Sequence, residues 1–228
     1  MASLANIPAA ALLRHPAPRN TTVVDPRFRQ MLGDHAWASL PPSVRARFGR
    51  KALATQTINY VGEVSECRMN LAGRILANLC RLVGAPLPLN TDTGVAAAVC
   101  VTEDAAGRGQ FWTRQYCRRS GFPQIIHSSK RFAGPTGLEE YLGMGFGIAL
   151  VLKVEAEVLY FDSDHYFWRA GPLRLRLPKW LAPGRLRIGH IDCDHGWFAF
   201  TLALDHPWFG TLVRQTCQFT EYRPGEAR

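Results

Sequence analysis

The residues best suited to bind a small anion lie in one predicted strand near the middle of the chain. Trp112, Arg114 and Tyr116 recur at every second position, so in an extended strand their side chains point to the same side. If that side faces a cavity, Trp112 offers a flat apolar wall and Arg114 a planar guanidinium for a carboxylate or phosphate. The alternative is a surface ladder in which Arg114 stacks on Trp112.

Glu140 and His127 are the candidates for acid–base catalysis. Glu139 and Glu140 follow a predicted turn, so one of these carboxylates should point inward. A buried carboxylate can act as a general base with a raised pKa, or it can neutralise Arg114 in a structural ion pair. His127 lies on the same side of its strand as Ser129 and is either a proton shuttle or a structural histidine.

Two further polar groups are weaker candidates. His165 and Arg169 share one face of a predicted strand and, with the predicted turn at residues 162–164, could form a polar mouth for the ligand. His190, Asp192 and Asp194 alternate in a later strand, and their side chains suit zinc, manganese or iron. Side chains two residues apart in a strand stand nearly parallel, however, and rarely converge on one ion. We therefore predict no metal site and no cofactor.

Composition excludes several classes of protein. The net charge is +9, from 27 Lys+Arg and 18 Asp+Glu, which favours anionic partners, but no nucleic-acid-binding motif is present. The six cysteines are far apart and form no CxxC pair, so we interpret them as reduced packing residues. No signal peptide and no apolar run of about 20 residues is found. These features predict a cytoplasmic protein without a transmembrane segment.

The elements that position these residues are predicted from hydrophobic periodicity. Apolar residues at three- and four-residue steps predict a helix over 68–83, and shorter helices are expected after Asp25-Pro26 and after Leu40-Pro41-Pro42. From residue 94 onward the period is two, with turn residues every eight to twelve positions. We predict an α+β fold that is mainly antiparallel β. Its curved meander sheet would form a lipocalin-like barrel or half-barrel with the N-terminal helices packed on it.

The predicted organisation is a flexible lead-in at residues 1–24 and a single barrel-like domain at residues 25–228. Small barrels are either filled by side chains or hold one small ligand.

The chain from about Phe28 onward resembles a bacterial family of uncharacterised domains, DUF4166. Five segments carry the resemblance: residues 28–34, Leu40-Pro41-Pro42, Trp112-Thr113-Arg114, residues 137–140 and residues 177–183. His206-Pro207-Trp208-Phe209-Gly210 is similar to the family's last proline, apolar pair and glycine. The resemblance implies a metabolic context beside NAD(P)-binding dehydrogenase-like domains, but it implies no catalytic residues.

Three functions are consistent with these observations. The first is a domain that handles a small apolar or aromatic ligand, with or without an anionic group. Its cavity could also catalyse a cofactor-free isomerisation or cyclisation. The second is a non-catalytic ligand-binding or partner module that acts beside an NAD(P)-dependent dehydrogenase. The third is a carrier that associates with anionic membranes, which requires Arg174, Arg176, Lys179 and Trp180 on one outer face.

Overall fold

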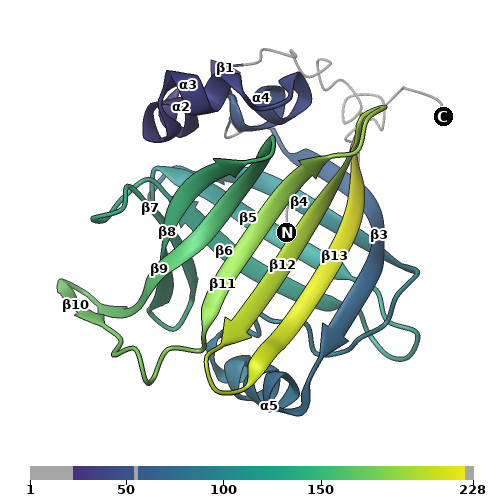
Figure 1. Cartoon of the computed structure of the whole chain (residues 1–228), viewed down its shortest axis with the longest axis vertical. Coiled ribbons are helices and arrows are strands. Elements are labelled where there is room, and N and C mark those ends of the chain that lie inside the picture. The colour runs from purple at the N-terminus through teal and green to yellow at the C-terminus, as the bar shows by residue number, and fades with distance from the viewer. Residues whose placement is uncertain (1–22, 54–55, 224–228) are drawn as a thin grey trace, which may run out of the picture.

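The structure is a computed structural model that describes residues 23–53 and 56–223, and it is a closed β-barrel capped by helices (Figure 1). Ten antiparallel strands follow one another around the barrel, and β13 pairs with β3 to close it. The barrel strands are β3 (Ile58–Met69), β4 (Val95–Asp104), β5 (Gly109–Tyr116), β6 (Gln124–Arg131), β7 (Leu138–Gly143), β8 (Phe146–Glu155), β9 (Val158–Ala170), β11 (Arg185–Asp192), β12 (Trp197–His206) and β13 (Gly210–Tyr222). This closed meander confirms the predicted fold class.

Short strands and helices lie outside the barrel wall. Strand β10 (Leu173–Arg176) pairs with β9, and β1 (Val23–Val24) pairs with β2 (Arg50–Lys51). Helices α2 (Arg27–Leu32), α3 (Asp34–Ala38) and α4 (Pro42–Phe48) cover one end of the barrel, whereas α5 (Leu71–Leu79) and the 3₁₀ turn η1 (Cys80–Val83) cover the other (Figure 1). Positions 1–22 of the predicted lead-in lie outside the described residues, and Val23 and Val24 belong to β1.

The end covered by α4 is filled by aromatic side chains. Phe28 of α2 and Phe48 of α4 are buried, and their ring centroids lie 6.2 Å and 5.6 Å from that of Phe161 in β9. Phe48 also contacts His190 of β11 edge-on, with 4.8 Å between the ring centroids. Burial of these rings from distant segments holds the N-terminal helices on the barrel.

Helix α5 is held at the opposite end by a specific cap and a close backbone contact. Asn70 is the N-cap: its side chain accepts a hydrogen bond from Gly73 N at 2.8 Å and donates one to Phe209 O at 2.8 Å. A Cβ atom on Gly73 would lie 2.0 Å from Leu212 O, so only glycine permits this approach of α5 to β13. The helix predicted over 68–83 begins later, at Leu71, because β3 extends to Met69.

The predicted turn at residues 162–164 is wrong, because β9 runs without interruption from Val158 to Ala170. The pairing register with β8 shifts between Ala149 and Leu150, which face His165 and Ser163. A bulge at this position takes up one extra residue and keeps the chain in the sheet. The reversal lies instead at Ala156 and Glu157, which have φ angles of 49° and 64°.

Candidate functional site

A cavity of about 360 Å³ occupies the half of the barrel nearest α5. Almost all of its wall is apolar, which favours an apolar ligand body. Leu76, Leu79, Cys80 and Val83 cover it from α5 and η1, and the loop 177–184 contributes Leu177, Leu181 and Pro183. The barrel strands contribute the rest of the lining, which includes Leu142, Phe146, Ile148, Tyr166, Leu186, Ile188, Leu202 and Leu204.

Arg114 and Glu140 are the two charged groups that line this cavity among the residues the structure describes. The Arg114 guanidinium donates from Nη2 to Glu140 Oε1 at 2.6 Å and to Ser128 Oγ at 2.7 Å. The three residues come from the neighbouring strands β5, β6 and β7, and all three side chains point inward. Glu140 therefore forms the ion pair with Arg114 that the sequence indicated as the alternative to a role as general base.

Lys130 completes the charged cluster from the side away from the main cavity. It lies opposite Glu140 in the β6–β7 pairing, and its ammonium Nζ lies 3.2 Å from Glu140 Oε2. Nζ also lies 4.5 Å from the ring centroid of Trp112, a cation–π contact that partly compensates for the loss of water. Lys130 is only 2% exposed. We name Arg114, Lys130, Glu140 and Ser128 the charged cluster.

The charged cluster has more positive than negative charge. Burial by itself would raise the pKa of Glu140, but the charges of Lys130 and Arg114 outweigh it and hold that pKa well below the usual 4.5. Burial lowers the pKa of Lys130 to about 8, although Glu140 opposes this shift. Near neutral pH the cluster thus contains two cations and one carboxylate, all removed from water.

Two polar atoms of the charged cluster have unused hydrogen-bonding capacity. Within the described part of the chain, Arg114 Nε and Glu140 Oε2 are buried without a hydrogen-bond partner. Lys130 lies near enough to Oε2 for an ion pair, but its ammonium does not have hydrogen-bond geometry toward that oxygen. A buried donor without an acceptor costs free energy. An anion that accepted a hydrogen bond from Arg114 Nε would remove this cost and add negative charge to the cluster.

The part of the barrel interior next to Arg114, on the side away from the main cavity, is nearly solid. Trp112 and Tyr116, which share the inward face of β5 with Arg114, line a residual space of about 10 Å³ rather than the main cavity. His190 lies in the same region, with its ring centroid 5.5 Å from that of Phe200. Burial, reinforced by Arg47, lowers the pKa of His190 well below 6.5. Arg114 borders both spaces and marks the boundary between the hollow and the filled half of the barrel.

The remaining candidates do not join this cluster. His127 is exposed on the outer face of β6, where its Nδ1 lies 3.2 Å from Thr113 Oγ1. His165 and Arg169 project outward from β9, so they form no mouth to the cavity. Arg169 is exposed and donates from Nη1 to Tyr141 Oη at 3.2 Å.

His165 belongs to a second polar cluster on the outside of the barrel. Its Nδ1 lies 2.6 Å from Asp164 Oδ2, and its Nε2 lies 3.3 Å from Arg174 Nη2. A proton on Nδ1 satisfies both contacts, because Nε2 can then accept from Arg174. Arg174 also forms an ion pair with the buried Glu139. Glu139 and Glu140 therefore point to opposite faces of β7, and each is neutralised by an arginine.

The alternating residues His190, Asp192 and Asp194 differ in burial and in backbone position. His190 points into the barrel, Asp192 ends β11, and Asp194 has a φ angle of 61° in the following turn. No three His, Cys, Asp or Glu side chains within residues 23–53 and 56–223 are grouped as metal ligands.

Sequence reasoning missed Lys130 and Tyr166. Lys130 alternates with His127 and Ser129 and therefore shares the inward side of β6 with the apolar Ile126. That alternation was a usable signal, but a lysine in a strand is normally assigned to the solvent side. Tyr166 reaches the cavity because of the bulge in β9, and alternation along the sequence does not reveal a bulge.

The fold and the site define a closed antiparallel β-barrel with an internal apolar cavity and a buried charged cluster. The profile of one family, described as a domain of unknown function (DUF4166), matches residues 40–219. The chain belongs to this family. No curated protein and no solved structure matches the chain. In the described part of the chain, no helix is long and apolar enough to cross a membrane.

Proposed function

We propose that this protein binds an amphipathic small molecule with one anionic group inside its barrel. The apolar body of the ligand occupies the cavity next to α5, and its carboxylate, phosphate or sulfonate group reaches Arg114. The observation that carries the proposal is the position of the charged cluster, with its excess of positive charge, at the inner end of an otherwise apolar cavity.

The size and chemistry of the cavity support this proposal. A volume of about 360 Å³ falls within the range of about 300–1,000 Å³ that is usual for small-molecule sites. An apolar wall with a few polar groups at one end fixes the orientation of a ligand, because burial drives its apolar part inward while the charge selects its head. Arg114 suits a planar carboxylate because its guanidinium presents several donors in a fixed fork.

The charges favour binding over acid–base catalysis. Lys130 and Arg114 hold Glu140 as an ionised carboxylate with a lowered pKa, which makes it a weak general base. His127 lies outside the barrel and is not available to a ligand in the cavity. We therefore propose a ligand-binding or carrier role in preference to an isomerase or cyclase.

A matched pair of fluorescent probes tests the anionic preference. 1-Anilinonaphthalene-8-sulfonate and N-phenyl-1-naphthylamine share the same rings, but only the first has a sulfonate. We expect Glu140→Gln to strengthen binding of the sulfonate, because Arg114 then lacks its carboxylate partner, and Arg114→Met to weaken it. Each change should be about tenfold, the effect of roughly 1.4 kcal/mol in binding free energy. Binding of the uncharged probe should change little in either variant.

A second pair of variants tests whether both probes bind in the cavity. Ile148 is buried and lines the cavity, so Ile148→Trp should weaken binding of both probes. Leu175→Trp, at a half-exposed position on β10 outside the barrel, is the matched control. The proposal is wrong if folded Ile148→Trp leaves both affinities unchanged, or if folded Glu140→Gln gains no affinity for the sulfonate.

A further inference from the structure

The rim of the cavity at the α5 end exposes large apolar side chains to solvent. Leu79 and Leu181 line the cavity and are nevertheless 60% and 56% exposed. Leu82, three residues after Leu79, and Trp180, which precedes Leu181, are 79% and 71% exposed. We name these four residues the mouth rim; they come from α5, η1 and the loop 177–184.

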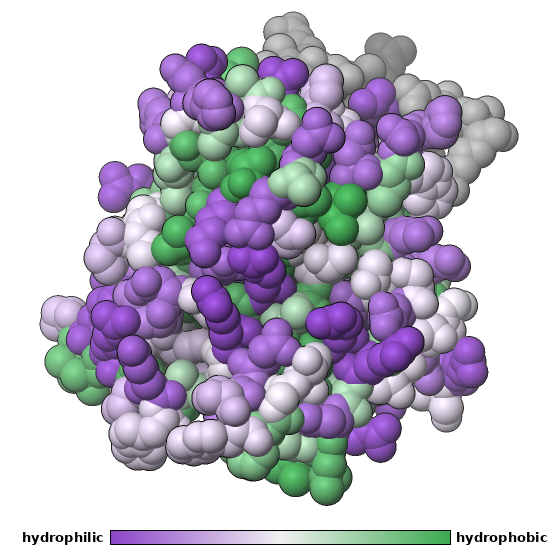
Figure 2. All heavy atoms as spheres, viewed as in Figure 1, coloured by the Kyte–Doolittle hydropathy of each residue, from purple (hydrophilic) through white to green (hydrophobic). Residues whose placement is uncertain are grey.

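The apolar surface continues onto the turn between β12 and β13. Trp208 and Phe209 in this turn are exposed, and Phe209 O accepts a hydrogen bond from the N-cap residue of α5. Figure 2 shows hydrophobic residues at the end of the molecule where Figure 1 places α5. Contiguous exposed apolar surface of this kind marks an interaction site.

The two segments that supply the mouth rim carry charges of one sign. Residues 71–83 and 173–186 contain no Asp or Glu. They contain six basic residues: Arg74, Arg81, Arg174, Arg176, Lys179 and Arg185. Apart from Arg174, these side chains are exposed. Aromatic and leucine side chains surrounded by Lys and Arg are typical of surfaces that lie in the headgroup region of an anionic bilayer.

We infer that the mouth rim docks on the surface of an anionic lipid bilayer, with the open end of the cavity facing the membrane. The apolar side chains enter the acyl boundary while the basic residues contact the lipid phosphates. Docking in this orientation would let an amphipathic ligand pass between bilayer and cavity without crossing water. This last step rests on the proposed function, whereas docking itself does not.

Two variants with nearly equal exposure test the docking site. Leu82 in the mouth rim and Val24 in β1, at the opposite end of the barrel, are 79% and 74% exposed. Leu82→Asp and Val24→Asp change the net charge equally. Binding is measured by flotation with phosphatidylcholine vesicles with and without phosphatidylglycerol. We expect the unmodified protein to bind only the anionic vesicles and to be released by high salt.

We expect Leu82→Asp and Trp180→Asp each to weaken vesicle binding by about tenfold, and Val24→Asp to change it by less than about twofold. Equal losses in Leu82→Asp and Val24→Asp would overturn the docking site, as would equal binding to both kinds of vesicle. Absence of vesicle binding together with concentration-dependent self-association that Leu82→Asp abolishes would also overturn it, in favour of a second copy. A dehydrogenase-like protein captured through the rim without vesicle binding would overturn it in the same way.

The probe titrations separate this inference from the proposed function. Leu82→Asp should keep the affinity of the unmodified protein for 1-anilinonaphthalene-8-sulfonate, because the side chain lies outside the cavity lining. Loss of vesicle binding with probe binding retained would assign the rim to docking alone. Loss of both vesicle binding and probe binding would show that Leu82→Asp also disturbs the cavity. That result would overturn the assignment of the mouth rim to docking.

Discussion

Lys130 lies directly opposite Glu140 in neighbouring strands, and the two side chains meet inside the barrel with 3.2 Å between Nζ and Oε2. On the other side of the carboxylate, Arg114 donates to Oε1 at 2.6 Å. Two inward-pointing cations thus share one carboxylate between them. The structure retains this arrangement although apolar residues of similar size would avoid the cost of removing three charges from water.

Removal of the shared carboxylate should destabilise the protein strongly. Glu140→Gln leaves Arg114 as a buried cation without a counter-charge and removes the carboxylate that favours the charged form of Lys130. We expect it to lower the free energy of unfolding by about 3–5 kcal/mol. In a Lys130→Met background the same change should cost less, because the ion pair between Lys130 and Glu140 is already absent. Urea unfolding of the four proteins measures this coupling, and additive effects of the two substitutions would contradict it.

The charged cluster also predicts how stability depends on pH. The pKa of Glu140 is lower in the folded protein than the ordinary 4.5. Its contribution to stability is therefore complete above about pH 4.5 and is lost as the pH falls through the folded-state pKa. Lys130 has a pKa lowered from 10.5 to about 8, so between these values the unfolded chain binds more protons. The contribution of Lys130 to stability then rises with pH over that interval.

Urea unfolding at a series of pH values, compared between the unmodified protein and Lys130→Met, isolates the lysine contribution. The unfolding free energy of the unmodified protein minus that of Lys130→Met should increase from pH 8 to pH 10. A difference that is flat over this interval would show that Lys130 titrates as an ordinary lysine. Other titrating groups are common to both proteins and cancel.

Gly73 should be needed for the position of α5 over the cavity. In Gly73→Ala the new Cβ would lie 2.0 Å from Leu212 O, so α5 must move away from β13. We expect a loss of about 1–3 kcal/mol in unfolding free energy, as for other overpacked sites. Asn78→Ala, at an exposed position on the same helix, is the control and should stay within about 0.5 kcal/mol. Equal stability of both variants would contradict the close contact.

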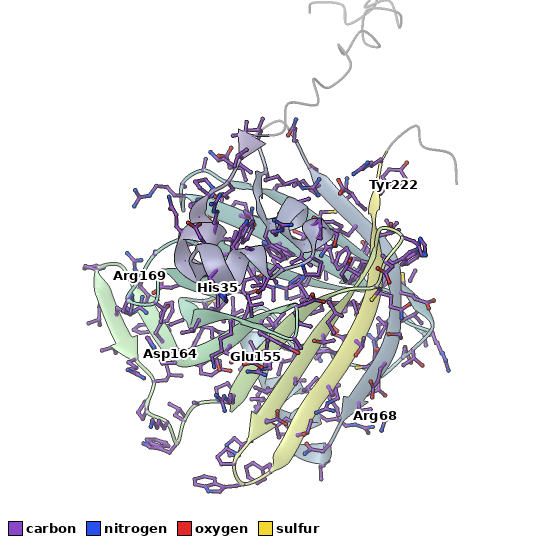
Figure 3. All side chains as sticks on the ribbon, turned by 45° about the horizontal axis from the view of Figure 1, so that its top comes forward. His35, Arg68, Glu155, Asp164, Arg169 and Tyr222 are labelled. Atoms are coloured by element: carbon purple, nitrogen blue, oxygen red, sulfur yellow. The ribbon has the colours of Figure 1, made fainter. Side chains whose placement is uncertain are left out.

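The second polar cluster, formed by Asp164, His165, Arg174 and Glu139 on the outside of the barrel, should contribute to stability and not to ligand binding. Arg174→Met leaves the buried Glu139 without its guanidinium partner and should cost about 1–3 kcal/mol. Binding of 1-anilinonaphthalene-8-sulfonate should be unchanged, because Arg174, His165 and Arg169 lie outside the barrel (Figure 3 labels Arg169). Arg176→Met, at an exposed position on the same strand, is the control. If Arg174→Met weakened probe binding and Arg176→Met did not, the outer cluster would have to be part of the ligand site.

The inward face of β5 and the candidate Glu140 were accessible to sequence reasoning. Side chains alternate strictly along a strand, so Trp112, Arg114 and Tyr116 had to share one side, and one of two successive glutamates had to face them. The same rule fails along β9, because the bulge near His165 changes which residues face inward. This bulge is not apparent in the hydrophobic pattern.

The order of polar and apolar residues was sufficient to predict an antiparallel meander and to place Trp112, Arg114 and Tyr116 on one side of their strand, because both follow from local periodicity. Which part of the barrel is hollow depends on contacts between segments far apart in the chain. Phe28 and Phe48 fill one end, whereas α5 covers the other end without filling it. Closure of β13 on β3 and the meeting of Lys130, Arg114 and Glu140 are likewise long-range relationships, so only the tertiary structure establishes the cavity and its charge.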